Sequence, residues 1–189
     1  VASTQDEDAT TQAAHAAASN VIPLRRVSAV ERAAGVAAAP VVDLRFAAGS
    51  FSDVQTLEER ATEWVALPDW IRPQPDLFVA QVVGESMNRR IPNGAWCLFR
   101  GNPGGTRQGK VVVVQHRSIA DPDTGGRYTV KLYASEKIAA DDGGWAHERI
   151  TLRPDSDQAG FEPIVLQLRD GQDALTVVGE LLTVLDAEK

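Results

Sequence analysis

The most constraining feature of the sequence is a succession of short apolar runs that begins at Val41 and continues almost to the end of the chain. Glycine, proline and aspartate separate the runs, and each run has the length and the β-branched content of a strand. The runs are VVDLRF, DLFVAQVVG, AWCLFR, KVVVVQH, RYTVKLYA, RITLRPDS, EPIVLQL and LTVVGELLTVL. This pattern predicts a mainly-β domain over residues 41–189, with one helical candidate at LEERATEWV, residues 57–65.

Residues 1–40 have a different composition. They are rich in Ala, Ser, Thr, Gln and Asp and contain few large apolar side chains. Such a segment buries too little surface to offset the entropy of ordering it. We therefore expect a flexible tail or linker, with room for one alanine-rich helical turn. The first residue is valine rather than methionine, which suggests a processed product or a fragment of a longer protein.

The charge balance argues against nucleic-acid binding. The net charge is -7, so the chain lacks the overall attraction to a phosphate backbone that dedicated nucleic-acid binders show. We expect no direct DNA binding by this chain. No apolar run approaches the length of a membrane span, and no basic start followed by an apolar stretch indicates a signal peptide. These features predict a cytoplasmic protein without membrane contact.

The thiol and imidazole side chains do not form a metal-binding pattern. Cys97 is the single cysteine, which excludes a disulfide framework or a thiolate cluster within one chain. His15, His116 and His147 are scattered, and no two of them have the spacing that places two imidazoles on one helix face. We expect neither a metal nor a cofactor.

A long hairpin is predicted between two of the apolar runs. The segment QHRSIADPDTGGR joins KVVVV to YTVKLY, and its Pro122 and Gly125–Gly126 are typical of a hairpin tip. Pairing of the two runs would place Lys131 on a central strand.

The segment QVVGESMNRRIPNG, residues 81–94, ends a strand-like run at Gly84 and then presents Ser86. A serine hydroxyl becomes a good nucleophile only when a base takes its proton, and a neutral lysine can be that base. The free pKa of lysine is near 10.4, so the amine needs apolar surroundings that lower it. Val130 and Leu132 flank Lys131 and offer such surroundings.

Each residue taken alone also has an ordinary structural interpretation. Strict alternation groups Lys131 with Thr129 and Tyr133 on a face that could point to water. Ser86 could cap a short helical turn that begins at Met87. The residues alone leave these alternatives open.

The order of the pieces resembles the serine peptidase domain of the LexA repressor, the phage repressors and the UmuD protein. The resemblance runs from about Val41 to Leu185. It is carried by VVGESM, a basic pair, IPNG, an apolar strand, RQGKVVVV and YTVKLY. ITLRPDSDQAGFEPIVLQL is similar to the family's strand, loop and strand near the C-terminal end, and LTVVGELLTVL to its last strand pair. The resemblance implies a LexA-like peptidase fold, with twisted antiparallel sheets and short helices.

The resemblance also assigns roles to residues of this chain. It implies that Ser86 is the nucleophile and Lys131 the general base of a Ser-Lys dyad. The main-chain amides of Glu85 and Ser86 would hold the oxyanion, at a turn whose N–H groups face the developing negative charge. Met87 would pack beneath the serine.

Members of this family usually cut their own chain at an Ala-Gly or Cys-Gly bond N-terminal to the serine. Ala48–Gly49 in LRFAAGS fits best, because Gly49 lies 37 residues before Ser86, close to the family's separation. Small residues let an extended backbone enter a narrow cleft. Alternatively, FAAGSFS is only a loop of small residues. A second pair, Ala34–Gly35, is expected to belong to the tail.

Two departures from the family pattern stand out. Residues 1–40 are too short and too polar for the helix-turn-helix that the repressors carry ahead of the cleavage site. The family's usual DGD turn is replaced by PNGAW, with Asn93 and Ala95 in place of the acids.

Three functional hypotheses follow. The first is a self-cleaving serine peptidase that releases or inactivates an N-terminal segment in a stress, DNA-damage or phage-related response. The second is a UmuD-like dimeric module that docks partners with little catalytic turnover. The third, a signal-peptidase-like enzyme acting on other proteins, is disfavoured because no membrane anchor is found.

Partners are implied by the resemblance alone. It implies a homodimer, with LTVVGELLTVL either as a contact strand or as ordinary core. It also implies the chain's own N-terminal segment as substrate, and it leaves a RecA filament or another activating protein as a possible trigger.

Overall fold

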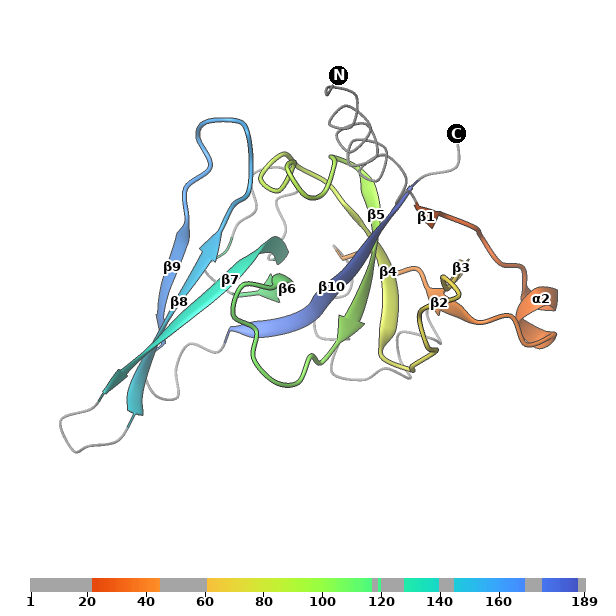
Figure 1. The fold of residues 1–189 in the computed structure, drawn as a ribbon, viewed down its shortest axis with the longest axis horizontal. Helices are drawn as coiled ribbons and strands as arrows, with labels where there is room; N and C mark the ends of the chain where they lie inside the picture. The colour runs from red at the N-terminus through yellow and green to blue at the C-terminus, as the bar shows by residue number, and fades with distance from the viewer. Residues whose placement is uncertain are drawn as a thin grey trace, which may run out of the picture.

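The computed structural model describes residues 22–44, 61–116, 119, 128–139, 145–168 and 175–186. These residues form a mainly-β fold with one short helix, which confirms the predicted fold class (Figure 1). The elements in chain order are β1 (Ile22–Pro23), α2 (Ala29–Ala33), β2 (Ala38–Pro40), β3 (Trp64–Ala66), β4 (Leu77–Val82), β5 (Ala95–Gly101), β6 (Val111–Gln115), β7 (Tyr128–Ala139), β8 (Trp145–Arg153), β9 (Ile164–Leu168) and β10 (Thr176–Asp186).

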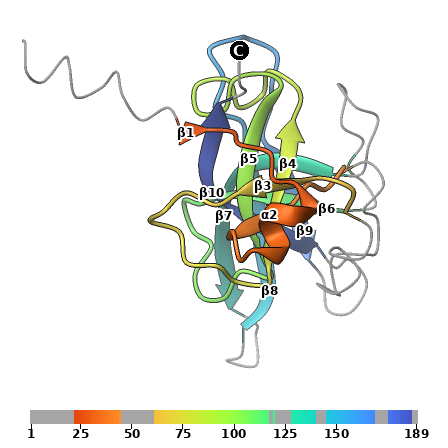
Figure 2. The ribbon, with the colours of Figure 1, turned by 90° about the vertical axis from the view of Figure 1, so that its right-hand side faces the viewer.

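The large sheet has the strand order β4-β5-β10-β6-β7-β8-β9, and β1 is added to β10 in parallel. Strands β7, β8 and β9 form an arm at one end of the molecule, and α2, β2 and β3 lie at the opposite end (Figure 1). Seen from that opposite end, α2 and β1 lie in front of the sheet (Figure 2).

Strand β10 corrects one expectation from the resemblance. LTVVGELLTVL was expected to form a pair of strands, but it is one long strand between β5 and β6. Its Gly179 lies within this strand and not in a turn. A Cβ atom at this position would lie 2.9 Å from the ring of Phe78, so the absent side chain leaves room for that ring. Since β10 is central, the structure supports the interpretation of this segment as core, and the homodimer stays a prediction.

Residues 22–40 differ from the flexible tail expected for residues 1–40. Strand β1 pairs with the end of β10, and β2 pairs with β3. Leu24, Val27 and Ala39 are buried. The prediction was wrong for this part because it weighed average composition, whereas a few well-placed apolar side chains suffice to dock a short segment on a sheet.

Helix α2 follows from local sequence signals. Ser28 accepts a hydrogen bond from the Glu31 N–H group, and the Glu31 carboxylate accepts one from the Ser28 N–H group, so the two form a capping box. The helix ends at Ala33 with Ala34 as its C-cap, and Gly35 has a φ of 92°. The Ala34–Gly35 pair therefore lies at a helix end and not in an extended segment.

The helix proposed for residues 57–65 is not found in its described part. Residues 61–63 are irregular, and Trp64–Ala66 form β3. Val65 is almost fully buried and pairs with Ala39 of β2. The pairing of the β-branched Val65 with β2 thus outweighs the helical pattern that the charged residues before it suggest in the sequence.

The remaining predicted strands are found, with one exception. In VVDLRF, Val41 makes only an isolated parallel bridge to Val79 of β4, and no regular strand forms in the described part of that run. The predicted pairing of KVVVV with YTVKLY is confirmed, because β6 and β7 are antiparallel with Val112 opposite Lys131.

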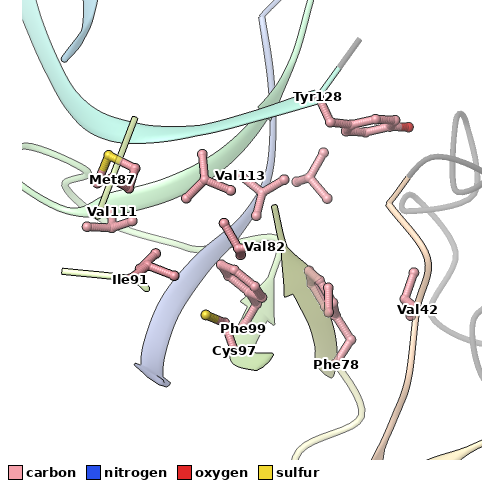
Figure 3. Packing of buried hydrophobic residues seen from close by; sticks show 13 residues of the cluster. Val42, Phe78, Val82, Met87, Ile91, Cys97, Phe99, Val111, Val113 and Tyr128 are labelled. Carbon is pink, nitrogen blue, oxygen red and sulfur yellow. The ribbon is translucent and has the colours of Figure 1, made fainter. Parts of the chain in front are cut away.

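The core beside the serine segment consists of apolar side chains from β4, β5, β6, β7 and β10. Phe78 of β4 stacks on Phe99 of β5 with ring centroids 5.4 Å apart. Met87 and Ile91, which follow β4, enter the same cluster (Figure 3). The core thus reaches directly beneath the segment that carries Ser86.

Candidate active site

Ser86 lies in a series of turns that follows β4. Gly84 has a φ of 117°, a conformation that glycine adopts at little cost and that redirects the chain away from the strand. The N–H groups of Arg90 and Ile91 then donate to the Met87 carbonyl oxygen. The buried Met87 side chain anchors the segment, as the resemblance implied.

Lys131 lies on β7, and its amine meets the serine hydroxyl. Lys131 Nζ is 2.7 Å from Ser86 Oγ. The same nitrogen lies 2.8 Å from Thr129 Oγ1 and 3.0 Å from the Val130 carbonyl oxygen. The Lys131 side chain is only 6% exposed. Two residues 45 positions apart in the sequence thus form one hydrogen-bonded pair.

The ordinary alternative for Lys131 is wrong. Thr129, Lys131 and Tyr133 do share one face of β7, but that face is buried and does not point to water. Ser86 does stand at the start of a short turn, residues 86–90, and its hydroxyl lies against Lys131 Nζ.

The pair of side chains can share one proton. A neutral amine has two N–H groups and one lone pair. The Val130 carbonyl oxygen can only accept, so it takes one N–H group, and Thr129 Oγ1 can accept the other. The lone pair then faces the Ser86 hydroxyl. This arrangement is the one that general-base activation of a serine requires.

Comparison with known families identifies the family of the chain. The model of the Peptidase S24-like family matches residues 40–138, just over half of the chain. This chain belongs to the Peptidase S24-like family. The resemblance to the LexA and UmuD peptidase domain is thereby confirmed at the level of the family. No protein with a curated description matches the sequence significantly.

Within this S24-like domain, the amides expected to hold an oxyanion are those of Glu85 and Ser86. Their N–H groups donate to no acceptor in the part of the chain that the structure describes. These groups belong to the serine itself and to the residue before it. N–H groups that are not used within the fold are available to stabilise negative charge on a carbonyl oxygen.

The connection between β8 and β9 holds the serine segment from the outside, a role that sequence reasoning missed. The Asp155 N–H group donates to the Ser86 carbonyl oxygen at 2.8 Å, and the Arg89 N–H group donates to the Asp155 carbonyl oxygen at 3.2 Å. The Asp155 carboxylate also bonds Arg90. Hydrogen bonds between main-chain groups do not depend on residue type, so the sequence does not reveal them. The one indication was that this connection resembles the corresponding part of the family.

Thr129 is a second residue whose contact was not foreseen. Its position two residues before Lys131 puts both side chains on the same face of a strand. In the sequence alone, this spacing favours a face of the strand that is exposed to water. A buried lysine needs polar partners near its amine, and this requirement could have identified Thr129.

The predicted cleavage site, Ala48–Gly49, lies outside the described residues. The chain leading to it is described as far as Leu44. Val41 bridges Val79 in parallel, and the Val42 N–H group donates to the Val79 carbonyl oxygen at 2.8 Å. Residues 41–44 therefore run alongside β4 in the same direction as that strand, which is the direction that leads to Ser86.

The remaining candidate groups are placed as follows. Cys97 is buried in β5, and burial raises the pKa of its thiol to about 12. No group of His, Cys, Asp and Glu side chains suited to a metal ion occurs in the described ranges. Among the same residues, no helix has the length and apolar character needed to cross a membrane.

Proposed function

We propose that this chain is a serine peptidase of the LexA type that cuts its own backbone at Ala48–Gly49, with Ser86 as nucleophile and Lys131 as general base. The observation that carries the proposal is the 2.7 Å contact between Lys131 Nζ and Ser86 Oγ, made by a lysine that is almost fully buried. Burial disfavours the charged form of an amine, and only the neutral form can accept the serine proton.

The reaction proceeds in two steps. Lys131 Nζ takes the proton of Ser86 Oγ while that oxygen attacks the carbonyl carbon of Ala48. The N–H groups of Glu85 and Ser86 hold the oxyanion. The C–N bond to Gly49 breaks, and the Lys131 ammonium gives its proton to the new amine. Water then attacks the ester between Ala48 and Ser86, Lys131 again takes and returns a proton, and the serine hydroxyl is restored.

The chain's own connectivity supports Ala48–Gly49 as the substrate. Ala48 lies seven residues after Val41, and Ser86 lies seven residues after Val79. Because Val41 and Val79 are bridged in parallel, the two segments start side by side, and the same number of residues leads from each of them to Ala48 and to Ser86. The four residues from Leu44 to Ala48 can span about 13 Å when extended. The product is a chain without its N-terminal segment, as expected of a protein that is switched by cleavage in a stress or DNA-damage response.

Intact-mass spectrometry of purified protein at neutral and alkaline pH tests the proposal. The wild type should accumulate a fragment that begins at Gly49, and faster at alkaline pH, because a larger fraction of Lys131 is then neutral. Ser86→Ala and Lys131→Ala should stay whole. Ser135→Ala, on the same strand as Lys131, is the matched control and should cleave normally. A fragment that forms equally in Ser86→Ala would refute the assignment of the nucleophile.

A further inference from the structure

We propose that Asn93 is a positioning residue for Ser86, an inference that rests on the proposed function of Ser86. The Asn93 side chain joins two groups that directly precede the serine. Its Oδ1 accepts a hydrogen bond from the Gly84 N–H group at 2.9 Å. Its Nδ2 donates to Glu85 Oε1 at 3.0 Å. One amide thus holds both the main chain of Gly84 and the side chain of Glu85.

Asn88 holds the other oxygen of the same carboxylate. Asn88 Nδ2 donates to Glu85 Oε2 at 3.1 Å and to Asp157 Oδ1 at 2.6 Å. Asn88 Oδ1 accepts from the Asp157 N–H group at 3.0 Å. We call Glu85, Asn88 and Asn93 the amide clamp. Through Asp157 the clamp ties the serine segment to the connection between β8 and β9, which lies outside residues 40–138.

The chemistry of the clamp explains why residue 93 is an asparagine in this chain. An amide offers both an acceptor and a donor, and Asn93 uses its acceptor for Gly84 and its donor for Glu85. An aspartate, the acid that the resemblance led us to expect here, would keep the acceptor. It would also place a second carboxylate at hydrogen-bond distance from Glu85, and two such like charges repel. The residues at positions 85 and 93 are therefore matched to each other.

The clamp acts on the groups that would hold the oxyanion. The N–H groups of Glu85 and Ser86 belong to the peptide units between Gly84 and Ser86. Fixing the Gly84 N–H group and both Glu85 carboxylate oxygens restricts the rotation of these units. Donors that are aligned before the reaction stabilise the oxyanion without reorganisation, and small misplacements slow the step. Asn93 touches no reacting atom, so it acts by positioning alone.

Four variants test the pairing: Asn93→Asp, Glu85→Gln, the double variant, and Asn102→Asp as a matched control in the exposed turn after β5. Asn93→Asp should release the Gly49 fragment about threefold to tenfold more slowly, the range of one hydrogen bond of ordinary strength. The double variant should regain the rate, because its new side-chain amide at position 85 can donate to the new carboxylate at position 93 and still accept from Asn88. Asn102→Asp should cleave like the wild type.

Amide hydrogen exchange at Gly84 separates this inference from the proposed function, because it requires no cleavage. Exchange should accelerate in Asn93→Asp, because repulsion by the Glu85 carboxylate moves the new carboxylate away from the Gly84 N–H group. It should return toward the wild-type value in the double variant. The thermal midpoint should change by no more than in Asn102→Asp. A wild-type cleavage rate and unchanged Gly84 exchange in Asn93→Asp would overturn the inference. So would a loss that Glu85→Gln fails to rescue. If the wild type itself does not cleave, the proposed function fails, and the exchange data still decide the clamp.

Discussion

Lys131 and Ser86 meet at one hydrogen bond but are held in different ways. Lys131 lies in the first part of β7, which pairs with β6, and its main chain is opposite Val112. Ser86 lies in a turn outside every strand of the described chain. It is held by the apolar side chains of Met87 and Ile91 and by hydrogen bonds to Asp155.

This difference indicates which of the two residues keeps its position when its surroundings are changed. The position of Lys131, the proposed base, depends on the pairing of its strand, and moving it requires breaking strand pairs. The position of Ser86, the proposed nucleophile, depends on a few contacts, each worth about 1 kcal/mol when it is a hydrogen bond. Loss of one of the hydrogen bonds around Ser86 should therefore alter the rate of cleavage before it alters the fold, whereas changes at Lys131 should act through its chemistry alone.

The largest effect is expected for Lys131→Met. The variant removes the base but keeps an unbranched side chain of similar length, so the cleavage rate should fall by at least about a thousandfold. Stability should not fall, because burying an amine costs more free energy than burying a thioether. Thermal unfolding and intact-mass measurements on the same sample check both statements. A large loss of stability would show that the sheet depends on the amine, against the comparison drawn above.

Ile91→Ala tests the apolar support of the serine segment. Ile91 is fully buried beneath the turns, and truncation of such a side chain costs about 2–5 kcal/mol of unfolding free energy. Val165→Ala on β9 is the matched control, since Val165 is 54% exposed and its truncation should cost less than about 0.5 kcal/mol. Denaturant unfolding measures both. Equal losses in the two variants would mean that the core does not anchor this segment.

The strands and the serine-lysine pair could be predicted from the sequence because their signals are local. Short apolar runs predicted the strands β4 to β9. The short motifs around Ser86 and Lys131 were sufficient to recognise the resemblance to the family. The contacts of Asp155 and Asp157 could not be predicted, because they join segments about seventy residues apart and some of them involve main-chain groups alone. The docking of residues 22–40 was missed for a related reason. It depends on where three apolar side chains meet the sheet, which composition does not reveal.

Thr129→Val probes the polar surroundings of the amine at nearly constant shape. The variant removes the hydroxyl that lies 2.8 Å from Lys131 Nζ. Without that partner the amine is less well oriented toward Ser86, so cleavage should slow by about tenfold, the equivalent of roughly 1.4 kcal/mol. Thr176→Val, at the start of β10, is a control for the same chemical change away from the site. A wild-type rate in Thr129→Val would mean that the sheet alone orients the lysine.

The smallest expected effect concerns Cys97, which lies in the same core cluster as Met87 and Ile91. Burial raises the pKa of its thiol to about 12 in the folded protein, whereas the thiol of the unfolded chain ionises at an ordinary value near 9. The thiol of the folded protein therefore loses its proton at a higher pH than the thiol of the unfolded chain. This contribution to stability is complete below about pH 9 and is lost as the pH rises from about 9 toward 12, by about 1.4 kcal/mol per pH unit.

In the proposed mechanism, alkaline pH thus has two opposite effects, since it favours the neutral form of Lys131 and weakens the core beneath Ser86. Unfolding of Ser86→Ala, with and without Cys97→Ala, at about pH 8 and about pH 10 isolates the second effect, because neither chain can cut itself. The chain that retains Cys97 should lose about 1.4 kcal/mol more between these two pH values. Equal losses would mean that the thiol ionises as easily in the folded chain as in the unfolded one.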